Sequence, residues 1–261
     1  MRAFLSAAAV ALAASFAGTQ TATAQNDFDW RGQIASGQTL EIKGVNGSIH
    51  ATASGSGDAE VHATKSANRS DPAGVRIVVV PHAGGVTVCA VYPDVADREP
   101  NTCEPGSGGH MNTQNNDTQV RFDVRVPAGV KFVGRTVNGE VAADSLNGDA
   151  EGHTVNGSVR VSTSGTARAN TVNGSLDLTM GRADFPDGAK FSTVNGGITL
   201  RMPSYLSANL KASVLNGTIE TDFPITVTGT VSRRKLEGTI GSGGQDLQLS
   251  TVNGNISLKT Q

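Results

Sequence analysis

A short phrase recurs through most of this sequence and constrains its fold more than any other feature. In most copies the order is a β-branched or polar residue, then Val or Leu, then Asn-Gly. An apolar residue follows two places after the Gly, as in TVNGSVRV from Thr154 to Val161. A phrase repeated this often is an architectural unit and not an active site. The Asn residues of the copies are Asn46, Asn138, Asn147, Asn156, Asn173, Asn195, Asn216 and Asn253.

Asn-Gly between two strands fits two geometries. In a two-residue β-hairpin the pair suits a type I′ turn, because both central positions need a positive φ. That register places Val252 on the opposite face of the strand beside Asn255, and the same conflict at nearly every copy leaves many exposed valines unexplained. If the chain instead turns the corner of a solenoid, the valine points inward, the Gly takes a strained dihedral angle and each Asn stacks on the Asn of the next coil.

The solenoid corner is the geometry that the sequence favours. We expect an all-β fold, a β-helix-like solenoid of about six or seven coils with an N-terminal β-sheet portion, roughly 30 Å tall at the usual strand spacing. An antiparallel β-sandwich or meander is the alternative. The expected corner residues are Asn46, Gly47, Asn138, Gly139, Asn156, Gly157, Asn173, Gly174, Asn195, Gly196, Asn216, Gly217, Asn253 and Gly254.

The first residues, 1–24, have the pattern of a secretory signal peptide. A basic residue precedes a short apolar run, and Ala22-Thr23-Ala24 provides a small-residue cleavage site. No later segment reaches the roughly 18 apolar residues of a membrane span. We therefore expect a mature chain without a transmembrane segment, exported to the periplasm, the extracellular medium or the cell surface. Its expected regions are an N-terminal β-strand region, 25–126, and a repeat region continuous with it, 127–261.

Cys89 and Cys103 are the two cysteines, and both fall in the exported part. An even number of cysteines in an oxidising compartment favours one disulfide, although two separate buried thiols fit the same composition. Residues 93–118 lose all periodicity around Cys103 and hold several Pro, Gly and Asn residues. A long irregular loop in a compact domain is usually functional or held in place, so we expect the disulfide to pin this loop.

Three stretches carry a resemblance to a known family. They are LEIKGVNGSIHATASGSGDAEVHATK, VRVPAGVKFVGRTVNGEV and LEGTIGSGGQDLQLSTVNGNISLK. From about Gly37 to Lys259 the sequence resembles the bacterial putative-adhesin family of β-strand-repeat proteins, a domain family of unknown function. The resemblance implies an all-β, solenoid-like fold, an exported or envelope location and no known catalysis. The loop with Cys89 and Cys103 departs from the simplest pattern of that family.

Carboxylates are present, but they do not form a catalytic pattern. Glycoside hydrolysis needs two facing carboxylates, and lyases need clustered acids that bind a metal. Glu220 and Asp222 share a strand face and are the best acidic pair, yet such a pair more often keeps a repeat soluble. The other acids considered, Asp177, Asp184 and Asp187, lie in one coil.

Metal, cofactor and nucleic-acid sites are not indicated either. The dispersed histidines lack the short spacing of a zinc site, and His110-Met111 is more often a loop surface than a copper site. Arg233-Arg234-Lys235 is the one run of three basic residues, and a solvated loop explains it better, because nucleic-acid binders show a basic stripe with aromatics. We therefore expect no cofactor, no metal and no nucleic-acid partner. The histidines are His50, His62, His82, His110 and His153.

These observations favour an exported, non-enzymatic protein, an adhesin-like structural or binding module of the cell envelope. The expected partner is an envelope glycan or protein, and residues 93–118 are the first place to seek recognition, because irregular loops on rigid scaffolds often bind ligands. The alternatives are a carbohydrate-active enzyme on a β-helix and an envelope-stress or sensing module that binds a partner protein. The last repeat, 251–259, has no obvious cap, so edge-strand self-association is expected there.

Overall fold

Strands make up all the regular structure of the described chain, apart from one short 3-10 helix, η1 (Pro72–Gly74). The computed structural model describes residues 27–227 and 232–261, so the expected signal peptide, 1–24, lies outside the described residues. No helix in these two ranges has the length and apolar character needed to cross a membrane. The all-β class expected from the sequence is confirmed.

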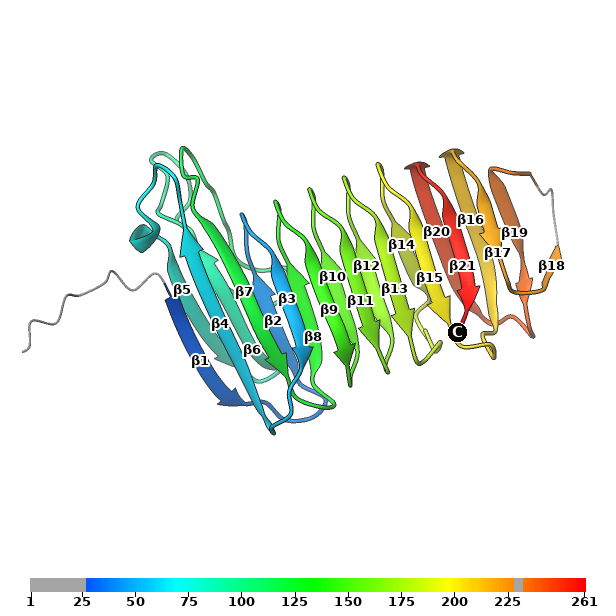
Figure 1. The fold of residues 1–261 in the computed structure, drawn as a ribbon, viewed down its shortest axis with the longest axis horizontal. Helices are drawn as coiled ribbons and strands as arrows, with labels where there is room; N and C mark the ends of the chain where they lie inside the picture. Colours follow the sequence, from blue (N-terminus) through cyan, green and yellow to red (C-terminus); the bar gives the residue numbers. More distant parts are fainter. Residues whose placement is uncertain (1–26, 228–231) are drawn as a thin grey trace, which may run out of the picture.

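The strands form two long sheets that run the length of a rod (Figure 1). Sheet A holds, in spatial order, β1 (Asp27–Gln33), β4 (Asp58–Ser66), β7 (Gln119–Val126), β3 (Ile49–Ala53), β9 (Val141–Leu146), β11 (Val159–Thr163), β13 (Leu176–Met180), β15 (Ile198–Met202), β21 (Ile256–Thr260) and β17 (Ile219–Thr221). Sheet B holds β18 (Ile225–Val227), β19 (Lys235–Ile240), β16 (Ala208–Asn216), β20 (Gln245–Asn253), β14 (Ala189–Ser192), β12 (Ala167–Asn170), β10 (Ala150–His153), β8 (Lys131–Arg135), β2 (Thr39–Lys43), β6 (Gly85–Val91) and β5 (Arg76–His82).

Seven two-strand coils build most of the rod, and each passes from sheet B to sheet A through an Asn-Gly corner. In spatial order the coils are β2–β3, β8–β9, β10–β11, β12–β13, β14–β15, β20–β21 and β16–β17. Equivalent strands of neighbouring coils pair in parallel, as β13 does with β15 and β10 with β12. This parallel pairing confirms the solenoid and excludes the antiparallel meander.

One Asn-Gly copy has a different place. Asn147-Gly148 lies between β9 and β10, so it returns the chain from sheet A to sheet B and is not one of the corners. Ser145, near the end of β9 and just before this turn, takes a positive φ of 54°. The phrase alone does not separate the return turn from the corners, because both place an aliphatic residue before Asn-Gly.

The last coil of the chain does not lie at the end of the rod. β20 pairs with both β14 and β16, and β21 pairs with both β15 and β17. The expectation that the last repeat, 251–259, forms an open edge is therefore wrong. The chain builds the outer coil β16–β17 first, extends it with the antiparallel strands β18 and β19, and then places its last coil between β14–β15 and β16–β17.

At the five corners that read Thr-Val-Asn-Gly, the threonine, and not the valine, points into the rod. Thr193 is 5% exposed, whereas its neighbour Val194 is 39% exposed. The Thr193 hydroxyl donates to the Gly174 carbonyl at 2.8 Å and lies 3.3 Å from the Val172 carbonyl. The inward valine expected from the sequence is therefore wrong. A threonine hydroxyl can be buried here because it bonds to the preceding coil, and the alternation of side chains then turns the valine outward.

Asparagine side chains stack along the outside of the corner. Asn195 Nδ2 donates to Asn173 Oδ1 at 2.8 Å, and Asn195 Oδ1 accepts from Asn253 Nδ2 at 2.8 Å. The residue after each Asn approaches the preceding coil closely, since a Cβ added to Gly174 would lie 2.0 Å from the Gly157 carbonyl oxygen. Gly174 has no positive φ, so the close approach alone selects glycine there. The strained dihedral angle expected from the sequence is found at three corners, where φ is 118° at Gly47, 153° at Gly217 and 156° at Gly254. The bonded row comprises Asn46, Asn138, Asn156, Asn173, Asn195, Asn253 and Asn216.

The inward faces of the two sheets enclose one continuous apolar core. Along strands such as β11 and β13, buried apolar residues alternate with outward residues, as expected for a sheet with one buried face. Trp30 of β1 packs against this core at the N-terminal end. The largest fully buried side chains are those of Tyr92, Phe122, Phe132, Phe185 and Phe191.

Two substitutions at one corner test these orientations. Thr193→Val keeps the side-chain shape but removes a buried hydroxyl that bonds to the Gly174 carbonyl, so the free energy of unfolding should fall by about 1–3 kcal/mol. Val194→Thr changes a side chain that faces solvent, so it should alter the free energy of unfolding by less than about 0.5 kcal/mol. Urea unfolding measures both variants. Equal losses, or a larger loss for Val194→Thr, would contradict the inward threonine.

Candidate functional site

A long loop takes the place of one corner. β6 pairs in parallel with β2 of sheet B, and β7 pairs in parallel with β3 of sheet A, so β6 and β7 act as the two strands of a further coil. The connection between them leaves the rod at the edge where the other coils carry Asn-Gly (Figure 1). Residues 93–118, here named the stapled loop, are therefore an expanded corner.

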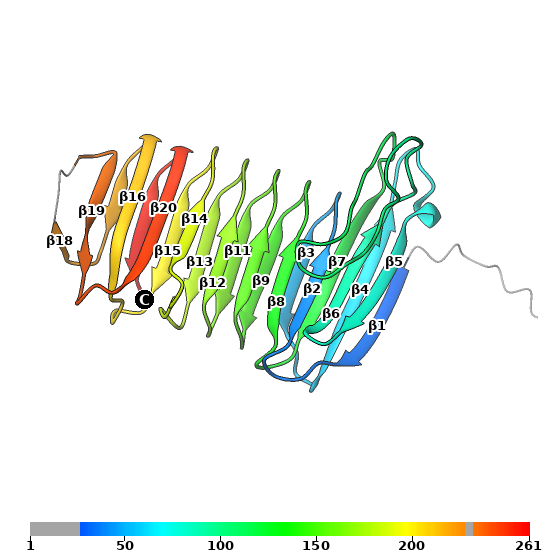
Figure 2. The same cartoon turned by 180° about the vertical axis from the view of Figure 1, so that it is seen from behind.

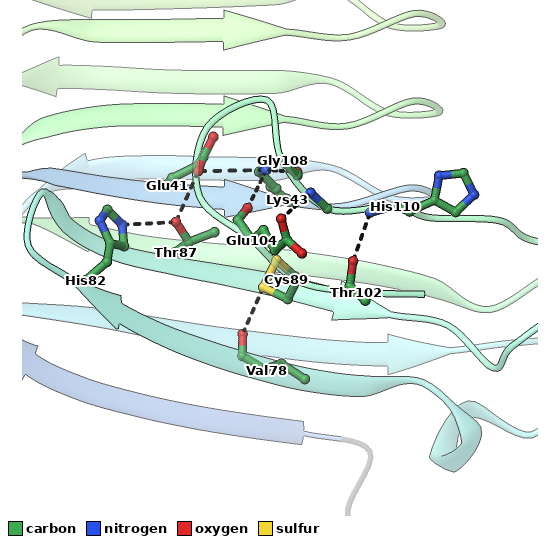
Figure 3. The surroundings of a disulfide bond; sticks show 12 residues. Glu41, Lys43, Val78, His82, Thr87, Cys89, Thr102, Glu104, Gly108 and His110 are labelled. Atoms are coloured by element: carbon green, nitrogen blue, oxygen red, sulfur yellow. Dashed lines mark hydrogen bonds and ion pairs between the residues drawn. A yellow bond between two sulfur atoms is a disulfide. The ribbon is translucent and has the colours of Figure 1, made fainter. Parts of the chain in front are cut away.

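A disulfide fastens the middle of the stapled loop to sheet B. Cys89 in β6 and Cys103 in the loop are bonded, with their Cα atoms 5.8 Å apart (Figure 3). Cys103 Sγ also lies 3.8 Å from the carbonyl oxygen of Val78 on β5. The disulfide expected from the sequence is thus present, and the loop lies over the outer face of sheet B (Figure 2).

A lysine ammonium group holds the tip of the loop. Lys43 Nζ, at the end of β2, donates to the carbonyl oxygens of Glu104 at 2.6 Å, Gly106 at 2.6 Å and Gly108 at 3.0 Å. The Lys43 side chain is only 18% exposed, and this burial lowers the pKa of its ammonium group below 10.5. Since backbone carbonyls replace water around the charge, Lys43 fastens the loop from inside and is not free for a ligand.

A buried carboxylate holds the same part of the loop. Glu41 Oε2 accepts from the Gly106 amide at 2.8 Å and the Thr87 hydroxyl at 3.1 Å, and Oε1 accepts from Arg135 Nε at 3.0 Å. Sequence reasoning missed Glu41, Lys43 and Arg135. Outward positions of a strand are ordinarily polar, and nothing in the strand pattern shows that a loop covers these three.

The base of the loop is organised around one buried amide. Asn101 Nδ2 donates to the carbonyl oxygens of Tyr92 at 3.1 Å and Asn112 at 2.9 Å. Asn101 Oδ1 accepts from the Asn112 amide at 2.5 Å, so the amide side chain joins both arms of the loop. The Tyr92 hydroxyl donates to the Thr118 carbonyl at 2.7 Å and ties the first residue of the connection to the last. Although irregular, the loop is pre-organised.

An aspartate fixes the end of the loop to a neighbouring turn. The Asp117 carboxylate accepts from the backbone amides of Ser70 at 2.9 Å, Arg69 at 3.1 Å and Asn68 at 3.2 Å. Hydrogen bonds from Ser70, joined by those from Asn68 and Arg69, lower the pKa of Asp117 from 3.8 to about 2. The loop end therefore depends on a carboxylate that stays ionised at neutral and mildly acidic pH.

A groove of about 290 Å³ lies between the stapled loop and the first corners. Val45, Val137 and Met111 contribute aliphatic side chains, while the loop contributes a glycine-rich backbone and His110. Met111 packs partly against the core, and His110 Nε2 lies 2.6 Å from Asn112 Nδ2. The groove is thus an apolar recess with hydrogen-bonding groups at its wall, an arrangement that suits ligand binding.

The outward aliphatic residues of the corners form a row that begins in this groove. Val137, which lines the groove, is 38% exposed, and the next members, Val155 and Val172, are each 40% exposed. Neighbouring members belong to adjacent coils about 4.8 Å apart. Scattered exposed valines are ordinary, but an unbroken row is a feature of interaction surfaces. This valine ridge comprises Val137, Val155, Val172, Val194, Val252 and Leu215.

The acids considered for catalysis are dispersed in the fold. Glu220 is exposed on β17, at the end of sheet A, and faces Ser257 of β21 across the pair. Asp177 forms an ion pair with Arg201, and its strand β13 is separated from β17 by β15 and β21. The best acidic pair, Glu220 and Asp222, therefore stands at the end of a sheet, apart from the coil of Asp177.

The strands do bring histidines and acids together on the outer face of sheet A. His62, Asp123 and His50 are direct neighbours in register on β4, β7 and β3. His50 lies 3.0 Å from Asp144 and 3.7 Å from Asp123, and His62 lies 2.7 Å from Asp29, along a groove of about 570 Å³. Within the described parts of the chain, no three His, Cys, Asp or Glu side chains are grouped to bind a metal ion.

Comparisons with known proteins give one match to a family model and distant structural likenesses. The family model described as Toastrack DUF4097 matches residues 130–259. The structure is similar to a putative cell adhesion protein from Clostridium sporogenes, with TM-score 0.45, 11% identity, and coverage of 90% of this chain and 100% of that one. A putative adhesin from Bacteroides fragilis gives TM-score 0.37, 11% identity, and coverage of 90% and 97%. No curated protein matches the chain.

The Asp117 anchor predicts a loop that loosens in acid. A carboxylate whose pKa is depressed by folding stabilises the folded loop above its ordinary pKa of 3.8, and this contribution is lost as the pH falls to about 2. Asp117→Asn should therefore speed amide hydrogen exchange at residues 68–70 at neutral pH. Asp97→Asn, which removes the same charge from the same loop, serves as control and should leave this exchange unchanged. Similar exchange in both variants would show that the carboxylate does not hold the turn.

Proposed function

We propose that this chain, which carries a Toastrack DUF4097 domain over residues 130–259, is an exported and non-catalytic binding module of the bacterial cell envelope. Its recognition surface is the groove beneath the stapled loop, together with the adjoining start of the valine ridge. Its partner is an envelope glycan or protein. The repeat scaffold supplies rigidity, and the expanded corner supplies specificity.

The pre-organised loop is the observation that carries this proposal. A disulfide, the Lys43 ammonium, the Glu41 carboxylate and the Asn101 amide all hold a glycine-rich loop in one conformation beside an open groove. A loop that is already ordered loses little conformational entropy when a ligand binds. So many fastenings on an irregular segment are expected where a rigid scaffold presents a recognition loop, and they exceed what a simple connection between β6 and β7 requires.

Two further observations support export and a non-catalytic role. The pattern over residues 1–24 is that of a cleavable signal peptide, and a disulfide persists in oxidising compartments. The Glu41 carboxylate beside the groove is already bonded to three donors, and the Lys43 ammonium to three acceptors. Neither group is available as a general acid or base at a substrate, which favours binding over the alternative of a carbohydrate-active enzyme.

Two matched valine variants test the recognition surface. Val137→Lys places a charge in the groove, whereas Val194→Lys makes the same change at the same corner position outside it, with exposures of 38% and 39%. The mature chain is applied to arrays of envelope glycans and envelope proteins, and each ligand found is titrated against both variants. Desolvating the new charge at the centre of an interface should weaken binding by about tenfold or more for Val137→Lys, against less than about twofold for Val194→Lys.

Three results would contradict the proposal. They are the absence of any ligand, equal binding by both variants and the wild type, and a chain that remains in the cytoplasm with residues 1–24 attached. The mature chain is expected instead in the periplasmic or secreted fraction with Gln25 as its first residue.

A further inference from the structure

A row of cations lies on the outer face of sheet B, in the coils farthest from the stapled loop. Arg168 on β12, Lys190 on β14 and Lys211 on β16 each stand between buried residues of their strand, so they point outward. Gln248 of β20 lies between Lys190 and Lys211 and is the register partner of both. Two strand spacings therefore separate the two lysines, about 10 Å. The sequence places these cations about one coil apart, and the fold aligns them.

Uncharged hydrogen-bonding groups form a second row beside the cations. Asn170, Ser192, Ser250 and Ser213 are successive register neighbours on β12, β14, β20 and β16. Lys235 of β19 continues this row, since it faces Ser213. The two rows border a shallow recess of about 270 Å³ whose lining includes Lys190, Lys211, Lys235, Gln248, Ser213 and Ser250.

Two carboxylates lie among the cations of this face, and both are engaged by other lysines. Glu151, the register partner of Arg168, pairs with Lys131 at 2.6 Å. Glu237 lines the recess and is the register partner of Lys211. Lys235 pairs with Glu237 at 3.1 Å. In residues 27–227 and 232–261, by contrast, no carboxylate forms a salt bridge with Arg168, Lys190 or Lys211. The turn before Lys235 adds two exposed arginines. These are Arg233 and Arg234, so the basic run of the sequence lies beside Ser213 and Val214, near the end of β16.

We propose that this face binds a linear polysaccharide that bears carboxylates, lying across the strands and along the axis of the rod. Cations at fixed intervals attract an anionic chain and fix its register, and the row of hydroxyl and amide side chains bonds to the hydroxyl groups of the sugars. The strands hold these groups in place before binding, so the protein loses little conformational entropy when the polymer binds. The proposal concerns a surface separate from the groove under the stapled loop and does not rest on the function assigned to that groove.

The side chains of the recess favour a polysaccharide over a nucleic acid. Proteins that bind single-stranded nucleic acid place aromatic side chains beside their cations, because bases stack on them. The residues that line this recess include no aromatic side chain. A sugar ring with carboxylate and hydroxyl groups needs only the cations, serines and amides that are present.

Isothermal titration of the mature chain with oligogalacturonate tests the proposal. Neutral dextran oligosaccharides and single-stranded DNA of equal charge are titrated in parallel. The double variant Lys190→Gln, Lys211→Gln should bind oligogalacturonate about tenfold more weakly, because it loses two surface ion pairs with the carboxylates of the ligand. The double variant Lys190→Arg, Lys211→Arg keeps both positive charges and should bind oligogalacturonate about as tightly as the wild type. The affinity of the wild type should fall as salt is added.

A matched variant controls for the loss of charge. Arg76→Gln with Lys259→Gln removes two exposed cations from β5 and β21, away from the basic face, and should change the affinity by less than about twofold. Equal weakening in both double variants would overturn the proposal, because net charge and not this face would then govern binding. It would also be overturned if oligogalacturonate did not bind, or if DNA bound as tightly. A variant with the stapled loop shortened should keep its affinity for oligogalacturonate, which separates this surface from the groove.

Discussion

The rod depends on how closely its coils approach one another at the corner. A Cβ at Gly174 would lie 2.0 Å from the carbonyl oxygen of Gly157, and a Cβ at Gly196 would lie 2.0 Å from the carbonyl oxygen of Gly174. Only glycine permits this approach, and the approach in turn brings Asn195 within 2.8 Å of Asn173. The neighbouring threonine hydroxyl then reaches the carbonyl of the preceding coil and can be buried. Sterics, side-chain stacking and burial at the corner therefore support one another.

The same constraint determines where binding surfaces can arise. A corner built of Thr, Val, Asn and Gly leaves the valine outside, and repetition turns one exposed side chain into the valine ridge. Where the chain replaces a corner with the stapled loop, the loop sits at the start of that ridge and needs fastenings of its own, which Lys43 and Glu41 provide. On the flat outer face of sheet B, regular strand spacing aligns Lys190 with Lys211. A scaffold of repeated coils can thus present several ordered surfaces.

Much of this architecture could be predicted from the repeated phrase, because a corner is a local structure. The solenoid, the stacked asparagines and the expanded loop all follow from spacing along the chain. The direction of the valine could not be predicted, since the partner of the buried Thr193 hydroxyl is the Gly174 carbonyl of the preceding coil. The position of the last coil could not be predicted from the sequence either, because it depends on β16 pairing with both β19 and β20. Lys43 and Glu41 look like ordinary outward residues until the loop is seen to cross them.

The most direct test of the corner is a single added methyl group. Gly174→Ala would place a Cβ against the backbone of Gly157, whereas Gly55→Ala adds the same group where no atom lies within 4 Å. Denaturant unfolding of both variants should show a loss of about 3 kcal/mol or more for Gly174→Ala and less than about 0.5 kcal/mol for Gly55→Ala. Small and equal changes in the two variants would contradict the claim that close approach of the coils at the Asn-Gly corner holds the rod together.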